Sequence, residues 1–378
     1  MYSNRKATRT TTALLTAAAA LVAGCGGGPS AGAGPSRTGC PAALAKAGAA
    51  VRKAENADAS WNGPTIGPAA VPGRTIVYVA QTMTNPGVAG VAKGVQDAAK
   101  TIGWTVRVID GEGTPAGIQA ALSQAVTLGP SGIVIGGFDP QLTSQQVARA
   151  RSAHIPLIGW HAVDSPGPSE RGGLFTNVTT KVEDVARISA DWIVAQSDGD
   201  AGVVVFTDDS IPFARNKSEL IKRELATCSG VKLLAYENIP IPDASSRTPQ
   251  EVSSLLSRFP DEWTYSVAIN DLYFADAAAA LRAGGKPGSG PPFNIGAGDG
   301  DPSAFQRINN KQFQAATVPE PLSQQGWQII DEFNRAFAGR PASGYVAPVH
   351  IAMAKNSSGA SSWNPAGYRE AYRTIWRK

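Results

Sequence analysis

The sequence predicts an α/β protein with two doubly wound, Rossmann-like lobes joined by a hinge. From residue 74 to about residue 350, short Val/Ile-rich runs alternate with segments of helical period. This alternation indicates βαβ units whose parallel strands are buried on both faces. The chain has 378 residues, enough for two domains of ordinary size. A Pro/Gly-rich stretch at 165–173 divides the units into two sets.

The expected elements follow one another in a regular order. In the first set we expect strands at 76–80, 105–109, 132–135 and 156–160, with helices at 88–102, 115–128 and 141–152. In the second set we expect helices at 181–196, 213–226, 249–258 and 272–283, with strands at 203–206, 231–235, 265–269 and 293–295. Ligands of such sheets bind at the carboxyl ends of the strands, so polar residues directly after each strand are the candidate site residues.

The N-terminus has the features of an export signal. Basic residues precede a short apolar stretch at 13–23, which is too short to cross a bilayer. The stretch ends in Leu-Val-Ala-Gly followed by Cys25, which resembles the bacterial lipobox. This resemblance implies that residues 1–24 are removed and that the Cys25 thiol carries lipid, which anchors a protein without spanning the membrane. An ordinary secretory signal is the alternative.

A linker follows the signal. Residues 26–38 are rich in Gly, Pro, Ser and Ala, a composition typical of flexible linkers. We therefore expect residues 25–73 to form a lipid-anchored flexible stalk that contains a short helix near 42–57. Cys40 and Cys228 are the other two cysteines, and in an oxidising compartment they either form a disulfide or stay unpaired.

Composition excludes several functions. The net charge is +4, and much of it belongs to the export signal, so nothing indicates a nucleic-acid binder. The sequence lacks a Gly-x-Ser-x-Gly elbow and a Gly-x-x-x-x-Gly-Lys phosphate loop. Three scattered histidines do not favour a metal centre. We expect no enzyme, no cofactor and no metal, although residue types alone leave a glycosidase open.

Polar motifs follow the expected strands in a characteristic order. They are Thr84-Asn85-Pro86, Asp110, Asp139, Ile269-Asn270-Asp271 and Ile295-Gly296-Ala297-Gly298-Asp299-Gly300, with Ile155-Pro156-Leu157-Ile158 as the fourth strand. In this order the chain resembles the type 1 periplasmic binding proteins, specifically the ribose/galactose-binding group that serves ABC importers. The resemblance covers nearly all of residues 74–350.

The resemblance implies a set of ligand-binding residues. Asn85 matches a first-lobe asparagine that binds sugar hydroxyls, and Lys217 stands where the ribose binders have arginine. Asn270 and Asp299 match second-lobe contacts, and Glu320 falls where the family has a glutamine near the hinge. Planar amides and carboxylates suit hydroxyl groups because they satisfy two neighbours at once.

The first lobe departs from the family pattern. Where the family has paired aromatics that stack on a sugar ring, this chain has Gly87 and Val88. Where the family has an Asp-Arg pair after the fourth strand, this chain has His161 and Ala162. These small residues argue against ribose or galactose itself and leave room for a bulkier ligand beside Trp160 and His161. Asp139 completes the expected ligand set.

Each of these residues also has a structural interpretation. Trp160 is equally compatible with the core, Lys217 and Glu320 with the surface, and Asn270 and Asp299 with helix caps. Tyr273 and Phe274 begin a helix beside the expected cleft, where a core role is favoured.

The functional hypothesis is a monomeric, lipid-anchored solute-binding protein outside the cell membrane that delivers a sugar, polyol or sugar derivative to an ABC permease. We expect residues 74–175 with 321–350 to form its N-terminal lobe, and residues 176–320 with 351–378 its C-terminal lobe. A receptor of the same fold coupled to a membrane kinase is the main alternative, and a carbohydrate-active enzyme is a weaker one.

Overall fold

The computed structural model describes residues 39–57 and 59–377, and its strands form two six-stranded sheets. The order in the first sheet is β2 (Thr105–Asp110), β1 (Thr75–Ala80), β3 (Gly132–Gly136), β4 (Leu157–Trp160), β6 (Leu174–Val178), β5 (Gly167–Ser169). The order in the second sheet is β12 (Ala352–Met353), β11 (Ala316–Thr317), β10 (Phe293–Gly296), β9 (Tyr265–Ala268), β7 (Ala201–Thr207), β8 (Val231–Asn238). Neighbouring strands are parallel except at the β5–β6 and β11–β12 edges. The predicted doubly wound α/β class is confirmed.

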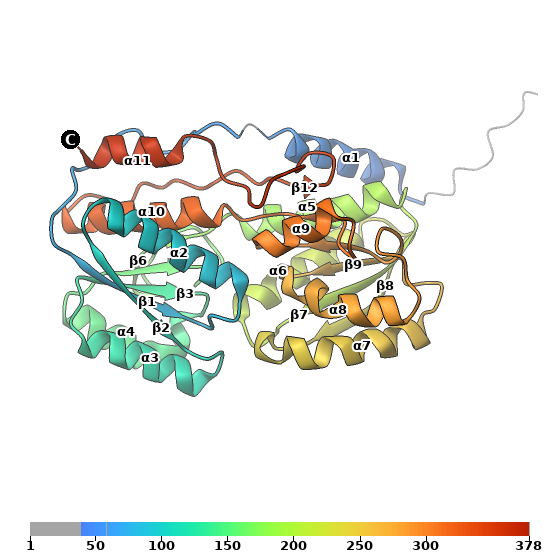
Figure 1. Ribbon diagram of the computed structural model, residues 1–378, viewed down its shortest axis with the longest axis horizontal. Helices are drawn as coiled ribbons and strands as arrows, with labels where there is room; N and C mark the ends of the chain where they lie inside the picture. Colours follow the sequence, from blue (N-terminus) through green and yellow to red (C-terminus); the bar gives the residue numbers. More distant parts are fainter. Residues whose placement is uncertain (1–38, 58, 378) are drawn as a thin grey trace, which may run out of the picture. The chain divides into compact units, whose positions relative to one another are not determined.

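Helices cover both faces of the first sheet. Helices α2 (Pro86–Thr101) and α10 (Leu322–Phe337) lie beside each other on one face, and α3 (Pro115–Thr127) and α4 (Ser144–Ser152) lie on the other (Figure 1). Successive side chains of a strand point to opposite faces. Tyr78 therefore joins the core under α2 and α10, whereas Val79 joins the core under α3 and α4.

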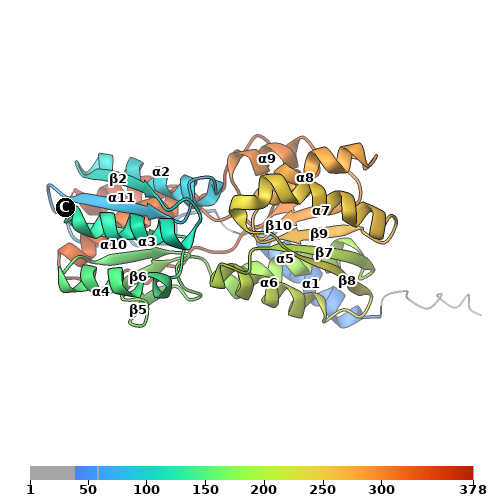
Figure 2. The same ribbon diagram turned by 90° about the horizontal axis from the view of Figure 1, so that it is seen from below.

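The second sheet is covered in the same way. Helices α1 (Pro41–Glu55), α5 (Val182–Gln196) and α6 (Pro212–Leu225) lie on one side of it, and α7 (Ala244–Arg258) and α8 (Leu272–Ala283) on the other (Figure 2). Val203 and Val205 of β7 face the first group, and Val204 and Phe206 face the second. The shorter elements are η1 (Pro140–Thr143), η2 (Ile241–Asp243) and α9 (Pro302–Asn309).

Several helix starts near the strand ends follow from local sequence. Proline occupies an initial position of α2, α3, α6 and α9, where its missing N–H leaves no hydrogen bond unmade. Asn85 caps α2 by accepting a hydrogen bond from the Gly87 backbone N–H, and Thr114 caps α3 in the same manner. Helix α7 begins at Ala244 rather than at 249, with Pro249 inside it.

The segment predicted as a flexible stalk is largely packed. Helix α1 buries Ala47, Val51 and Ala54 in the core of the second lobe, and Cys40 and Cys228 are disulfide-bonded. Residues 59–73 then run along the first lobe, where Asn334 exchanges hydrogen bonds with the backbone of this segment. The apolar spacing of α1 accounts for its docking. The signal peptide and Cys25 lie outside the described residues.

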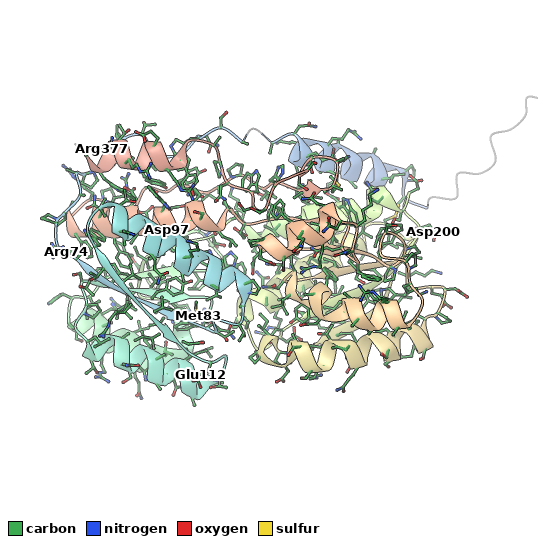
Figure 3. All side chains as sticks on the ribbon, viewed as in Figure 1. Arg74, Met83, Asp97, Glu112, Asp200 and Arg377 are labelled. Carbon is green, nitrogen blue, oxygen red and sulfur yellow. A yellow bond between two sulfur atoms is a disulfide. The ribbon has the colours of Figure 1, made fainter. Side chains whose placement is uncertain are left out.

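The lobe boundaries differ from the expected ones. The stretch at 165–173 does not separate the lobes, because β5 pairs there with β6 inside the first sheet. Of residues 351–378, β12 belongs to the second sheet, but α11 (Tyr368–Trp376) packs in the core of the first lobe (Figure 3, where Arg377 follows its end). Helix α11 places Tyr368, Tyr372, Ile375 and Trp376 on one apolar face, and that face needs a partner.

Candidate functional site

A polar cluster joins the two lobes at the carboxyl ends of their strands. The Asn270 side-chain amide, directly after β9, donates to Asn85 Oδ1 of the first lobe at 3.1 Å and to Asp299 Oδ2 at 2.6 Å. Gly87 matters for this contact, because a β-carbon there would lie 2.8 Å from Asp299 Cβ and closer still to its carboxylate. The absence of a side chain at Gly87 therefore lets Asp299 reach the N-terminus of α2.

Two buried ionisable side chains, Asp299 and Lys217, belong to this region. Asp299 is only 4% exposed, and burial raises its pKa to about 7 although Lys217 opposes that shift. Lys217, on α6, is 3% exposed and donates from Nζ to the carbonyl oxygens of Ala297 at 2.7 Å and Ile269 at 3.4 Å. Burial lowers the pKa of Lys217, against the attraction of Asp299 and Glu320. The pair thus places opposite charges in a nearly dry setting, where electrostatic interactions are strong.

A second polar network surrounds Glu320. Thr180 donates to Glu320 Oε1 at 2.5 Å, and the Gln325 amide donates to Oε2 at 2.6 Å. The same Gln325 accepts a hydrogen bond from Trp160 Nε1 at 2.7 Å. Burial alone would raise the pKa of Glu320, but His161, Thr180 and Lys217 hold it down at about 2. Thr180 lies between β6 and α5 and Glu320 lies between β11 and α10, where the chain passes from one lobe to the other.

Three rings stack across the cleft. His161 lies between Trp160, at 4.0 Å between ring centroids, and Phe213 of the second lobe, at 4.6 Å. Burial lowers the pKa of His161, although Glu320 opposes the shift. Its Nε2 is 3.4 Å from Glu320 Oε1 but makes no hydrogen bond with any described residue. His161 also has a φ of 48°, a conformation that costs a non-glycine residue about 1–3 kcal/mol.

The cavity enclosed by these groups is small. Its volume is about 40 Å³, whereas sites for small organic ligands usually have about 300–1,000 Å³. The room expected beside Trp160 and His161 is therefore taken in this conformation, because Phe213 extends from the second lobe onto His161. A small organic ligand would fit here only if Phe213 moved away from His161.

The structure brings most of the sequence-predicted residues together. The cavity is lined by Asn85, Trp160, His161, Lys217, Asn270 and Asp299. Glu320 contacts this group through His161. Asp139 is placed apart: it caps η1 by accepting from the Gln141 N–H at 2.8 Å, and it borders two neighbouring cavities instead.

Sequence reasoning missed three residues of the site. Phe213 follows a helix-starting proline and is apolar, so a search for polar residues after strands overlooks it. Thr180 and Gln325 are common polar residues whose partners lie 140 and 165 residues away. Tyr273 and Phe274, in contrast, lie in the second-lobe core as expected.

The described part of the chain gives little indication of a membrane-spanning helix or a metal site. None of its helices is both long and apolar enough to cross a bilayer. Nor does that part group three or more His, Cys, Asp or Glu side chains in a way that would hold a metal ion. The polar cluster between the lobes is therefore the leading candidate site.

Known proteins share this architecture. The family model described as "Periplasmic binding protein domain" matches residues 76–341, and the chain belongs to this family. Family membership confirms the resemblance noted in the sequence and implies a location outside the cytoplasm. Helices α1 and α11 lie outside the matched residues.

Individual relatives are distant. The ribose import binding protein of Escherichia coli is 22% identical over 261 residues, which cover 68% of this chain and 84% of that protein. An ABC transporter solute-binding protein of Agrobacterium vitis, solved with α-D-tagatopyranose, superposes with a TM-score of 0.68 at 14% identity, covering 78% of this chain and all of the other. A second Agrobacterium vitis protein, solved with allitol, has a TM-score of 0.64 at 18% identity and covers 75% and 96% of the two chains. These relatives are solute-binding proteins rather than enzymes.

Proposed function

We propose that this protein is an extracytoplasmic solute-binding lipoprotein that captures a small polyhydroxylated ligand between its lobes and delivers it to an ABC permease. The observation that carries the proposal is the polar cluster of Asn85, Asn270 and Asp299, contributed by both lobes and bordered by stacked aromatic rings. Planar amides and carboxylates bind hydroxyl groups, and rings bind the apolar face of a sugar. Distant relatives named for ribose, tagatopyranose and allitol support this ligand class.

The proposed mechanism is hinge closure. In an open state the amides and charges of the cluster are hydrated, and a ligand that bridges Asn85 to Asn270 and Asp299 replaces that water on both lobes at once. Its differential affinity for the closed state then shifts the population toward closure. The closed form, anchored through Cys25 and acting as a monomer, would be the species that docks on the permease.

A thermal-shift screen over sugars, polyols, amino sugars and nucleosides tests the proposal. A ligand present at 100 times its Kd adds about 2.7 kcal/mol to the free energy of unfolding, which gives a shift of several degrees in a protein of this size. Binding of a sugar or polyol, with compaction in small-angle scattering, is the expected result. Binding of nucleosides alone, or turnover of a glycoside, would contradict it.

Two variants locate the site. We expect His161→Ala and Asn270→Ala to weaken binding of the ligand found in the screen, since they remove the ring stack and the amide that bridges the lobes. Calorimetry measures both affinities. Unchanged affinity in both variants, with normal folding, would show that the ligand binds elsewhere.

A further inference from the structure

A second, larger cavity adjoins the small one between the lobes. Its volume is about 280 Å³, close to the lower end of the usual range for small-ligand sites. The first lobe supplies its wall from η1 and from the segment around β5, and the second lobe supplies Pro212 and Phe213. Phe213 lines both cavities, so the two cavities meet at this residue.

The side chains of this outer cavity suit a polyhydroxylated group. Asp139, Gln141 and Arg171 contribute planar polar groups to its lining. The Gln141 amide is held in place because it donates to the Arg171 carbonyl oxygen at 2.5 Å. The Arg171 guanidinium makes no hydrogen bond or ion pair with any described residue, so its five donors are available.

Phe213 adds the apolar element that sugar sites need. Its ring stacks on His161 and has Lys217 Nζ 5.2 Å from its centroid, and Phe213 also lines the outer cavity. An aromatic ring gives a large contact area to the C–H face of a sugar, while amides, carboxylates and guanidinium groups bind the hydroxyls around its edge. The outer cavity combines both elements, and it also accounts for the position of Asp139.

We infer that the outer cavity is a second ligand subsite, which takes a sugar unit linked to the one held by Asn85, Asn270 and Asp299. The ligand would therefore be a disaccharide or a similarly extended glycoside, whose glycosidic link passes beside Phe213 once that ring has withdrawn from His161. This inference rests on the proposed sugar-binding function. It adds that a single ring fills only the inner half of the site.

Calorimetry on the purified protein compares monosaccharides with disaccharides. The probes are D-galactose, D-glucose, L-arabinose and D-ribose against lactose, melibiose, cellobiose and maltose. We expect at least one disaccharide to bind ten times or more tighter than each of its component sugars. If monosaccharides bind and no disaccharide has this advantage, the inference is overturned while the proposed function stands. If none of these sugars binds, the inference is overturned, and the proposed function is decided by the wider screen over polyols, amino sugars and nucleosides.

A variant in the outer cavity provides an independent readout. Arg171→Ala should reduce the ratio of disaccharide to monosaccharide affinity about tenfold, because it removes hydrogen bonds made only by the outer unit. Arg107→Ala is the matched control, since Arg107 is an exposed arginine on β2, at the opposite edge of the same sheet from β5. The second subsite is overturned if Arg171→Ala leaves the ratio of disaccharide to monosaccharide affinity unchanged. It is also overturned if Arg107→Ala lowers that ratio equally.

Discussion

Lobe closure depends on a glycine, and substituting it tests the cleft directly. In the structure the Asp299 carboxylate packs against Gly87 at the start of α2, where a β-carbon would lie 2.8 Å from Asp299 Cβ. Gly87→Ala therefore forces Asp299 away from the first lobe. The substitution does not strain the helix, because alanine favours helical backbone over glycine by about 0.5–1 kcal/mol. Closure and lobe stability should respond in opposite directions.

The expected magnitude comes from the hydrogen bond between the lobes that this displacement would break. The Asn270 amide, which Asp299 holds in place, donates to Asn85 Oδ1 at 3.1 Å, and a hydrogen bond between neutral groups contributes about 0.5–1.5 kcal/mol. Loss of that bond lowers the closed-to-open ratio by about 2- to 12-fold. Ligand affinity falls by a similar factor, since the ligand stabilises the closed form.

Small-angle scattering and calorimetry measure these effects. Gly87→Ala should increase the radius of gyration and weaken binding of the best ligand from the screen, while its unfolding midpoint in urea is unchanged or higher. Gly48→Ala is the matched control, because Gly48 lies in α1, where a β-carbon meets only the end of the Arg52 side chain. Wild-type scattering together with wild-type affinity in Gly87→Ala would refute the contact between Asp299 and α2.

Three further predictions concern pH, the disulfide and the anchor. Burial raises the pKa of Asp299 above its unfolded value of 3.8 to about 7, so the wild type loses stability as pH rises from about 4 to about 7, by about 1.4 kcal/mol per pKa unit. Asp299→Asn should remove this part of the pH dependence of the free energy of unfolding. If the urea midpoints of wild type and variant change in parallel between about pH 4 and about pH 7, the prediction is wrong. Replacing Cys40 and Cys228 by serine opens a covalent link across 188 residues and should cost up to about 5 kcal/mol by chain entropy; an unchanged midpoint under non-reducing conditions would contradict this. Cys25→Ala should move the protein from the membrane fraction to the medium, and retention at the membrane would argue against the lipid anchor.

The sequence predicted the elements of both lobes closely. Buried parallel strands such as β1 and β7 are continuous apolar runs, and such runs are visible without any knowledge of their neighbours. Helix α10 was missed although its sequence has an amphipathic helical period. Gln324, Gln328 and Glu332 belong to its polar side yet are buried, and only the packing of the first lobe decides that.

Six predicted site residues line the inner cavity. Asn85, His161, Asn270 and Asp299 meet there because residues after parallel strands share one edge of a sheet, whereas Lys217 reaches it from helix α6. Asp139 shows the limit of that rule. It occupies such a position, yet its side chain caps η1 and lines the outer cavity rather than the inner one.

The sequence by itself therefore determined the fold class, the family and the residues available at the strand ends, because these depend on local hydrophobic period and short motifs. Tertiary structure decided how those residues meet. Asn85 and Asn270 are 185 residues apart and belong to different lobes. The contact between them, the stack of Phe213 on His161 and the docking of α1 and α11 depend on how separate surfaces fit together, and no local pattern in the chain records that fit.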